Sequence, residues 1–449
     1  MKKNTLLLIP IVFLLFMQIG FAQIKTADKL YNRFAYSKAI PYYLKIANSK
    51  DDGKRDAAIS RLAECYRLIN NYEQSVYWYQ EAVKNPETDT INYFYLGTVL
   101  RNLSHYDEAK VAFLKFAELK PSDPRGKKFA GFCEDIEKWK DISTATIKNK
   151  DDLNSEKSDF SPVIDNGSVV FTSDRGVDML DNNNYTWTGN AYLDLYSSKP
   201  ETENSYLGKM SVPEKLSKYF NKPFHDGPAC FTKDNKFVFI TRTQKDLSKR
   251  KKMRTDLLAI YYANINEEKP DFKPFPYNSE DYSVCHPAIS PDGVKLVFSS
   301  DMSGGEGGSD LYISRLENGE WTTPQNLGKE INTFGNEVFP GWFNDSTLFF
   351  SSDSRMGYGG LDIYKTNCSK DTWTVPVNLQ SPINSSYDDF GIVFLSDTEG
   401  FFSSDRPGGK GFDDIYQFSG FQINQINGID LGQNNYNYPA YPKSIMNTQ

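Results

Sequence analysis

The stretch SPDGVKLVFSSDMSGGEGGSDLYI, residues 290–313, contains the pattern that decides the fold of this chain. It reads Ser-Ser-Asp, a Gly-rich turn, and then Asp-Leu-Tyr. Three copies of Ser-Ser-Asp begin at Ser299, Ser351 and Ser403, at intervals of 52 residues, and two more divergent copies lie earlier in the chain. This self-similarity predicts a repeat architecture, whose units bury their apolar faces against their neighbours and present a surface. The pattern therefore favours a protein that binds something over one that transforms it.

Each of the five units divides into four short runs with strand character, joined by tight turns such as Pro291-Asp292-Gly293. Four antiparallel strands in ~40–60 residues indicate a propeller blade. An apolar residue followed by Asn precedes the first strand of every unit. These asparagines are Asn154, Asn221, Asn278, Asn332 and Asn384. The last unit ends after its third strand, and a spare strand-like run at 144–148 precedes the first unit. We therefore expect a five-bladed ring closed by that N-terminal strand, which would remove two exposed sheet edges.

The chain before the ring has helical periodicity, with apolar residues at three- and four-residue steps from about residue 27 to 140. Two units align at an interval of 34 residues, and small residues occupy equivalent places at Ala63 and Gly97. A tyrosine precedes each second helix, at Tyr36, Tyr72 and Tyr106. The pattern resembles the tetratricopeptide repeat (TPR) over roughly residues 24–121, and 125–140 is interpreted as a capping helix.

The TPR resemblance implies a concave face that holds an extended peptide or a partner helix. Mapped onto this chain, that face carries Ser60, Glu64, Arg67, Phe94, Thr98 and Arg101. The alternative is that these are solvated positions on a stack that only packs against the second domain.

The N-terminus has the pattern of a secretory signal peptide over residues 1–22. Lys2 and Lys3 precede an apolar run at 6–19, and small residues precede Gln23. A retained membrane anchor is the weaker alternative, because the run is shorter than the ~20 residues that span a bilayer. With no Cys near the cleavage point, we expect a periplasmic protein that is not a lipoprotein. The expected domains are a helical repeat domain at 23–141, the ring at 142–420, and an Asn/Tyr-rich polar tail at 421–449.

The charge balance argues against nucleic-acid binding. The net charge is −7, and it becomes −9 once Lys2 and Lys3 are removed, so the chain would not condense onto phosphates. The basic run at 249–252 with Arg254 is interpreted as a solvated loop. The five cysteines are scattered without metal-ligand spacing. A Cys230–Cys285 bridge and buried free thiols are the two alternatives, of which free thiols are the simpler.

The loops after the second strands and the turns before the first strands should share one face of the ring, because successive connections alternate between faces. The repeated Asp and Gly residues there are explained by turn chemistry, which leaves Arg175, Arg355 and Arg406 as candidates for binding a partner. Calcium at Asp301, Glu306 and Asp310 would have too few oxygen ligands. We therefore expect no metal and no cofactor.

Catalysis has little support in the sequence. The three histidines are His105, His225 and His286, and none has a carboxylate and a nucleophile at a recognisable spacing. No G-x-S-x-G elbow, HExxH motif or P-loop is present. The sequence therefore indicates a protein that is not an enzyme.

The blade sequence resembles the TolB-type, WD40-like propeller motif. The order of signal peptide, TPR-like repeats and five-bladed ring resembles the PorE-like, OmpA-family periplasmic proteins of Bacteroidota, which are associated with type IX secretion and gliding. An OmpA-like peptidoglycan-binding domain follows in that family, whereas this sequence stops near the end of the ring, so cell-wall anchoring is not carried over. The resemblance covers roughly residues 24–420.

The resemblance implies a non-enzymatic scaffold, whose helical stack and ring each engage protein subunits of an outer-membrane or periplasmic complex. The expected fold class is α+β multidomain, with an N-terminal α-helical solenoid followed by an all-β propeller. The alternative function is a periplasmic peptide- or glycan-binding module, or a hydrolytic one, whose ligand enters the central mouth of the ring. Fold alone does not decide between them.

Overall fold

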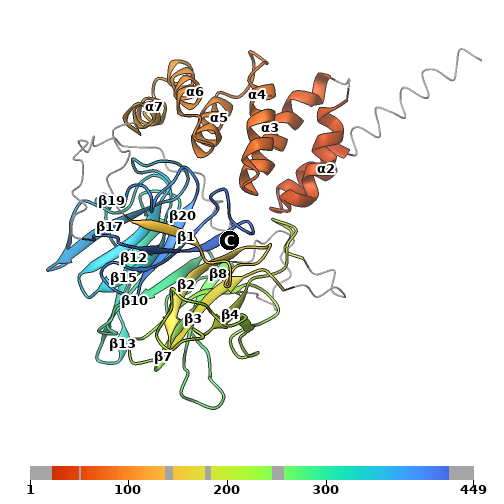
Figure 1. Cartoon of the computed structure of the whole chain (residues 1–449). Helices are drawn as coiled ribbons and strands as arrows, with labels where there is room; N and C mark the ends of the chain where they lie inside the picture. The colour runs from red at the N-terminus through yellow and green to blue at the C-terminus, as the bar shows by residue number, and fades with distance from the viewer. Residues whose placement is uncertain (1–22, 50–51, 137–144, 177–183, 245–256, 424–449) are drawn as a thin grey trace, which may run out of the picture.

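The computed structural model describes residues 23–49, 52–136, 145–176, 184–244 and 257–423. The expected signal peptide, the basic run at 249–252 with Arg254, and residues 424–449 of the expected tail lie outside this range. Within it, helices come first and strands follow, so the expected fold class is confirmed: a helical stack precedes an all-β ring (Figure 1).

The helical stack begins with a helix over residues 23–31 and continues through six further helices in the described part of the chain. These are α2 (Tyr36–Ala47), α3 (Asp52–Leu68), α4 (Tyr72–Ala82), α5 (Ile91–Asn102), α6 (Tyr106–Leu119) and α7 (Arg125–Asp135). Small residues let paired helices approach closely, as the repeat pattern predicts. A Cβ at Gly97 in α5 would lie 2.7 Å from the ring of Phe113 in α6. Between α3 and α4, the Ser75 hydroxyl donates a buried 3.0 Å hydrogen bond to the carbonyl of Ala63.

The core of the stack is aromatic. Tyr43, Tyr79 and Phe113 occupy equivalent places in successive repeats, and all three are fully buried. At the end of the stack, Phe129 of α7 lies 5.3 Å, between ring centroids, from both Phe94 and Phe113. Helix α7 therefore closes the apolar core in the way that a terminal repeat must.

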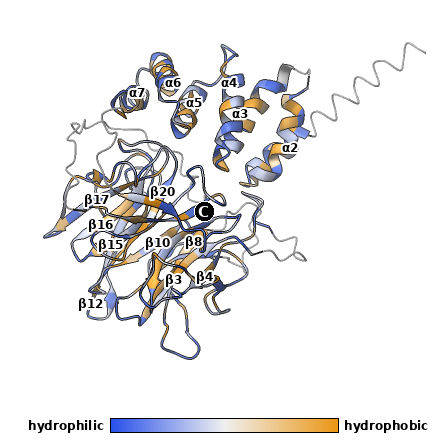
Figure 2. Ribbon diagram, viewed as in Figure 1, coloured by the Kyte–Doolittle hydropathy of each residue, from blue (hydrophilic) through white to orange (hydrophobic). Residues whose placement is uncertain are grey.

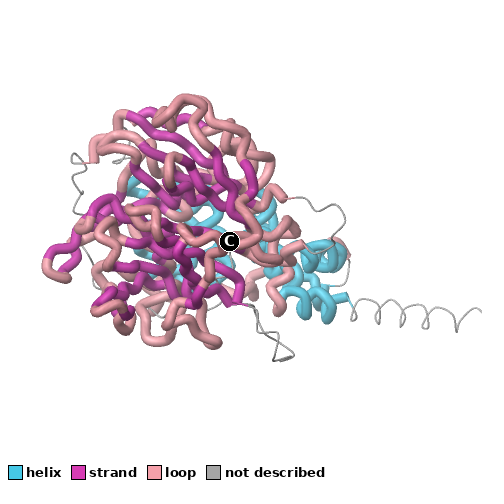
Figure 3. The backbone as a smooth tube through the Cα atoms, turned by 90° about the horizontal axis from the view of Figure 1, so that it is seen from below, coloured by secondary structure: helices cyan, strands magenta, loops and turns pink. Residues whose placement is uncertain are grey.

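The ring consists of five antiparallel sheets, which are its blades. Blade one contains β2 (Asp159–Asp165), β3 (Ser168–Ser173), β4 (Asp194–Ser198) and β5 (Glu214–Lys215), and blade two contains β6 (Asp226–Phe231), β7 (Phe237–Gln244), β8 (Leu257–Asn264) and β9 (Lys273–Pro274). Blade three contains β10 (Val284–Ile289), β11 (Lys295–Ser300), β12 (Asp310–Glu317), β13 (Glu320–Trp321) and β14 (Gln325–Asn326), and blade four contains β15 (Glu337–Asn344), β16 (Thr347–Ser352), β17 (Asp362–Ser369), β18 (Thr372–Trp373) and β19 (Val377–Asn378). Blade five contains β20 (Asp389–Phe394), β21 (Gly400–Ser404), β22 (Asp414–Ser419) and β1 (Thr146–Asn149). Hydrophobic residues concentrate in the strands, whereas the loops are mostly hydrophilic (Figure 2). Seen from below, the helices lie behind the strands (Figure 3).

The ring closes as the sequence predicts. Strand β1, from the N-terminal side of the ring, pairs antiparallel with β22, and Thr146 lies opposite Ser419. The prediction of five blades closed by an N-terminal strand is thus confirmed.

The chain does not leave the ring at residue 420, where we expected the polar tail to begin. Phe421 and Ile423 are buried, and their side chains join the apolar cluster around Phe418. In addition, the Lys365 ammonium donates a 2.8 Å hydrogen bond to the carbonyl of Ile423. Residues 421–423 therefore belong to the folded ring, because their apolar side chains pack into its core.

The five cysteines are free thiols, and all of them lie within the described residues. Burial is the main cause that raises the pKa of the Cys230 thiol to about 12, and a hydrogen bond with the backbone of Ile289 opposes this rise. Cys285 lies four residues before Ile289 on an extended strand, so the alternative of a Cys230–Cys285 bridge is wrong for this structure.

Candidate partner-binding surfaces

The asparagine before each first strand ties its blade to the preceding one. Its side-chain amide imitates a strand backbone: the oxygen accepts from, and the nitrogen donates to, one residue of the preceding third strand. Asn332, for example, makes bonds of 2.8 and 3.0 Å with the N–H and carbonyl of Leu311. Asn154 makes the same pair with Ile415 of blade five, both at 2.9 Å, and so fastens the closure of the ring. These side chains are occupied in building the ring.

The repeated aspartates are likewise occupied. In four of the five blades, the Asp after the second strand accepts a hydrogen bond from a backbone N–H just before the first strand, as in Asp301 with Ser283 at 2.7 Å and Asp353 with Asn336 at 2.9 Å. The Asp of the Asp-Leu-Tyr element binds the Gly-rich turn, and at Gly357 a Cβ would lie 1.9 Å from an oxygen of Asp362. Glycine is required there because no side chain fits.

The repeated arginines are not free to bind a partner, so the prediction for Arg175, Arg355 and Arg406 is wrong. Each guanidinium crosses to the turn before the first strand of its own blade and donates to backbone carbonyls there. These acceptors are Leu153 for Arg175, Glu330 and Ile331 for Arg355, and Pro382 and Ile383 for Arg406. Arg175 and Arg406 also pair with the carboxylates of Asp159 and Asp389, which are fully buried. The arginines are structural clamps.

A comparison of the five blades supports this reading. Blade two has the same pair, with Arg242 Nε at 2.6 Å from a carboxylate oxygen of Asp226. Blade three has lost both partners together: Val284 stands in place of the acid and Met302 in place of the arginine, and both join one apolar cluster. An arginine kept for partner binding would have no reason to disappear together with a buried acid.

The face that carries these loops is covered by the helical stack. The turn between the two helices of each repeat has a residue with positive φ, namely Phe34, Asn70 and Ser104 at 58°, 55° and 62°. All three turns contact the ring. The Asn70 amide donates to Asp388 at 3.4 Å, and the Ser104 hydroxyl donates to the hydroxyl of Ser386 at 2.7 Å. The repeat period therefore places equivalent turns in a row along the ring.

The first turn contacts the ring through a loop of blade one. Trp187 is 2% exposed and joins the core of the helical stack. Its ring stacks on Phe34 at 5.9 Å and meets Tyr36 edge-on at 4.6 Å. Its indole Nε1 donates to the carbonyl of Leu68 at 2.8 Å, and its own carbonyl accepts from the N–H of Ser37 at 3.1 Å. No pattern in the sequence identified this residue, because the loop has no counterpart in the other blades.

The last helices complete the interface. Phe129 of α7 meets Phe334 edge-on at 6.1 Å, and Arg101 of α5 donates a hydrogen bond to the carbonyl of Gly359. Burial is the main cause that lowers the pKa of Lys128 to about 8. On the ring side, burial raises the pKa of Asp362 and of Asp413 to about 7 in each case. The ring side of the interface is thus buried and rich in acids.

The predicted TPR groove is only partly accessible. The prediction is wrong for Phe94, which is fully buried beneath α7, and for Arg101, which is 2% exposed against the ring. Ser60 accepts a 3.0 Å hydrogen bond from Asn92, and Thr98 donates to the carbonyl of Phe94 in its own helix.

Two half-buried residues give the groove its charge. Glu64 lies 3.0 Å from Arg61 and 4.0 Å from Arg67, and the Arg67 guanidinium lies over Tyr95 at 4.2 Å. For Ser60, Glu64, Arg67 and Thr98, partner binding stays a prediction.

The axis of the ring is filled by aromatic side chains. Phe339 lies 4.6 Å from Phe390 and 6.5 Å from Phe160, and His286 stacks on Phe339 at 4.0 Å. At the corresponding place in every first strand, one residue has positive φ, where the strand bulges toward the axis. These residues are Ser161, Gly227, His286, Phe339 and Gly391. A ligand would have to displace this plug to enter the ring centrally.

Two of the three histidines are buried and neutral, and the third lies at the surface of the stack. His286 lies within β10 rather than before it, and burial lowers the pKa of both His286 and His225 to about 3, so both imidazoles are neutral. His225 Nδ1 accepts from the N–H of Leu193 at 3.1 Å. In the described residues, neither ring bonds to a carboxylate, hydroxyl or thiol side chain. His105 is half exposed, 3.6 Å from Glu108 at the surface of the stack.

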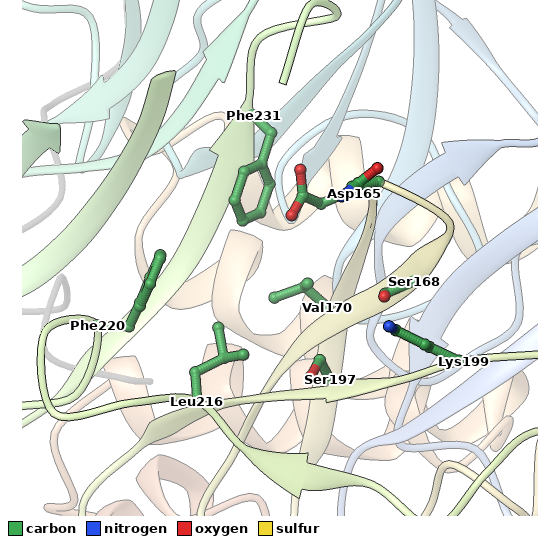
Figure 4. Close-up of a pocket in the computed structure, with 9 residues that line it drawn as sticks. Asp165, Ser168, Val170, Ser197, Lys199, Leu216, Phe220 and Phe231 are labelled. Carbon is green, nitrogen blue, oxygen red and sulfur yellow. The ribbon is translucent and has the colours of Figure 1, made fainter. Parts of the chain in front are cut away.

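A cavity of about 160 Å³ lies between blades one and two (Figure 4). Its lining residues are Asp165, Asn166, Ser168, Val170, Ser197, Lys199, Leu216, Phe220 and Phe231. Sequence reasoning did not single out any of them. Asp165 belongs to the turn between the first two strands of its blade, so it lies at the end of the ring away from the helical stack.

Two further features concern the residues that the structure describes. No group of three or more His, Cys, Asp or Glu side chains there is arranged to hold a metal ion. None of the helices described is both long and apolar enough to cross a membrane.

Comparison with known proteins finds no matching family model and no matching curated protein. Among solved structures, the chain is similar to a TPR-containing domain of an FK506-binding protein of Plasmodium falciparum (18% identity, 27% of this chain and 89% of that one, TM-score 0.24). It is also similar to TolB of Acinetobacter baumannii (14% identity, 60% and 56%, TM-score 0.32) and to a gluconolactonase of Xanthomonas campestris (11% identity, 61% and 89%, TM-score 0.35). At these identities and TM-scores the matches carry no argument about activity, ligand or partner.

Proposed function

We propose that this protein is a non-enzymatic scaffold that binds protein partners and holds them in a fixed relation. The observation that carries the proposal is the interface between stack and ring. Three equivalent turns, Trp187 and α7 all contact one face of the ring, so the two domains form one body with two separate outward surfaces. TPR stacks and propellers are both folds that present surfaces for binding.

The first surface is the remaining groove of the stack, where Arg61 and Arg67 flank Glu64. The second is the face of the ring that carries the turns between first and second strands. In the described part of the chain, the stack covers only the opposite face (Figure 1). One partner on each surface would be held on opposite sides of the molecule, which is the geometry that a bridging subunit requires.

The cellular setting follows from the resemblance and from the N-terminal pattern. We place the protein in the periplasm, as a subunit of a type IX secretion or gliding-associated complex, or of another complex at the outer membrane. Two features of the chain support this setting: the signal-peptide pattern at 1–22 and the order of helical repeats and ring.

The rival function, a peptide- or glycan-binding or hydrolytic module, requires a site at the mouth of the ring. The aromatic plug around Phe339 fills that mouth, and the two histidines of the ring are buried and neutral. We therefore retain the scaffold as the proposal.

The test is purification from native envelopes under mild detergent. We expect stoichiometric co-purification with other envelope proteins. Arg61→Glu should reduce one of them, because the Arg61 side chain is half exposed beside Glu64. Lys115→Glu is the matched control, since Lys115 is exposed on α6 and pairs only with its neighbour Glu118. Isolation of the protein alone, together with turnover of peptides or glycans by the isolated protein, would refute the proposal.

A further inference from the structure

The cavity between blades one and two has an apolar wall and a polar wall, and the polar wall carries one acid, Asp165, and one cation, Lys199. Val170 is 2% exposed, and Leu216, Phe220 and Phe231 are half-buried members of the same apolar cluster. The Oδ1 atom of Asp165 is buried and has no hydrogen-bond partner. Figure 4 shows the Asp165 carboxylate directed toward Phe231, whereas the Lys199 amine lies beside Ser168. The acid therefore sits at one end of a small space whose lining is partly apolar and partly polar.

The Asp165 side chain does not stabilise its turn, whereas the side chains at the corresponding positions of other blades do. In the corresponding turns, a side-chain oxygen accepts backbone N–H bonds: Thr232 from Phe237 at 2.9 Å, Ser290 from Lys295 at 2.9 Å, and Asn344 from Thr347 at 2.8 Å. In blade one, the next two residues are Asn166 and Gly167, both with positive φ. An Asn-Gly pair of this kind forms a tight hairpin turn without help from a side chain.

The carboxylate has no counter-charge. Burial alone raises the pKa of Asp165 to about 6, with no neighbouring cation to oppose it. A buried carboxylate oxygen without a hydrogen-bond partner costs stability, and a ligand that supplies the partner would remove that cost. The cavity has room for one such group, since a cavity of about 150 Å³ accommodates a benzene molecule.

We propose that this cavity is a docking site for a basic side chain of a protein partner, whose apolar stem packs against Val170, Leu216 and Phe220 and whose cation bonds to Asp165. Lys and Arg combine a long apolar stem with a charged end. The cavity offers an apolar wall to such a stem and a carboxylate to such a charge. The site deepens the proposed function, on which it rests, by assigning a basic partner surface to the ring face away from the stack.

The test uses the full chain and a minimal probe. Methyl groups of Val170 and Leu216, isotopically labelled for NMR, report on occupancy as N-acetyl-lysine amide is added. We expect saturable shifts of these methyl signals. N-acetyl-norleucine amide, which keeps the apolar stem and lacks the ammonium, should bind about tenfold or more weakly, because a charged hydrogen bond contributes at least that much.

Asp165→Asn should weaken binding of the lysine probe by a similar factor, about tenfold, while the methyl spectrum stays that of the folded protein. Asp397→Asn, an exposed acid in the matching turn of blade five, should leave binding unchanged. Lys199→Met should keep or tighten binding, since it removes a positive charge from the cavity lining.

Three results would overturn the inference: no saturable shift, equal binding of the two probes, or unchanged lysine binding by Asp165→Asn. If the cavity holds only water and does not bind the probe, no saturable shift is seen. Because the probe needs no native partner, this result is independent of the co-purification experiment. Loss of probe binding would leave the scaffold proposal intact, and absence of native partners would leave the cavity result intact.

Discussion

At the scale of single residues, polar side chains hold the ring together by forming, with backbone groups, hydrogen bonds that would otherwise come from a neighbouring strand. The asparagines pair with a neighbouring strand, and the arginines reach backbone carbonyls that no strand partner satisfies. Buried polar groups of this kind stabilise a fold only when all of their partners are present. The repeated polar residues of this chain thus stabilise the blades. Residues that bind a partner are to be sought at positions that differ between blades.

The arginine clamp can be tested with a double-mutant cycle in blade five. Arg406→Met leaves the fully buried Asp389 without its cation and should lower the free energy of unfolding by about 3–5 kcal/mol. The double variant Arg406→Met, Asp389→Val copies the Met302 and Val284 of blade three and should recover at least half of that loss. Urea unfolding measures both quantities. Losses that simply add would show that the two side chains do not act as a pair.

Asp165 should leave a signature in the pH dependence of stability. Its pKa in the folded protein is about 6, above the ordinary value of ~3.9 for an unfolded chain. The folded state therefore binds the proton more tightly, and this group destabilises the fold progressively as pH rises from ~4 through ~6. Asp165→Asn removes the effect, so the variant should gain stability relative to wild type across that window. A difference that is constant between pH 4 and 7 would contradict the assignment, and Asp397→Asn is the control.

At the scale of elements, the position of one loop decides how the stack meets the ring. The segment around Trp187 leaves blade one and joins the helical core, where it makes both backbone and side-chain bonds. It is the contact with the largest buried side chain in the interface, since Trp187 heads the fully buried residues by volume. The other two turns make polar contacts with the ring through Asn70 and Ser104.

Removal of this side chain should loosen the first two repeats from the ring. Trp187→Ala should lower stability by about 3–5 kcal/mol, as expected for truncation of a buried Trp, and should speed amide hydrogen exchange at Ser37, which donates to the Trp187 carbonyl. Trp373→Ala is the matched control, because Trp373 lies on the ring in β18. If exchange at Ser37 is as slow in Trp187→Ala as in the control, Trp187 does not hold the two domains together.

At the scale of the whole molecule, much of the fold could be predicted because it repeats. The 52-residue period, the five Asn positions and the missing fourth strand of the last unit together predict a closed ring of five blades. The place of Phe94 could not be predicted in this way, because α7 covers it and lies outside the aligned repeats. Trp187 gave no signal, since its loop has no equivalent in other blades.

The candidate site was harder to predict for a related reason. The role of Arg406 depends on an acid 17 residues earlier in a different strand, and a single blade does not reveal this pair. The comparison of blades does, because Met302 and Val284 change together. The sequence did not point to Asp165 because an Asn-Gly turn explains its neighbours. Only the three-dimensional structure shows that its buried Oδ1 atom lacks a hydrogen-bond partner.

The central claim is that stack and ring form one body, and a distance measured between them tests it most directly. The exposed Tyr77 of the stack and Val294 of the ring are replaced by Cys and spin-labelled, and the half-buried Cys230 and Cys368 are changed to Ala. Pulsed electron paramagnetic resonance then measures the distance between the two labels. We predict one narrow distance distribution that matches the structure. A broad or two-peaked distribution would mean that the domains move independently, which would contradict the account.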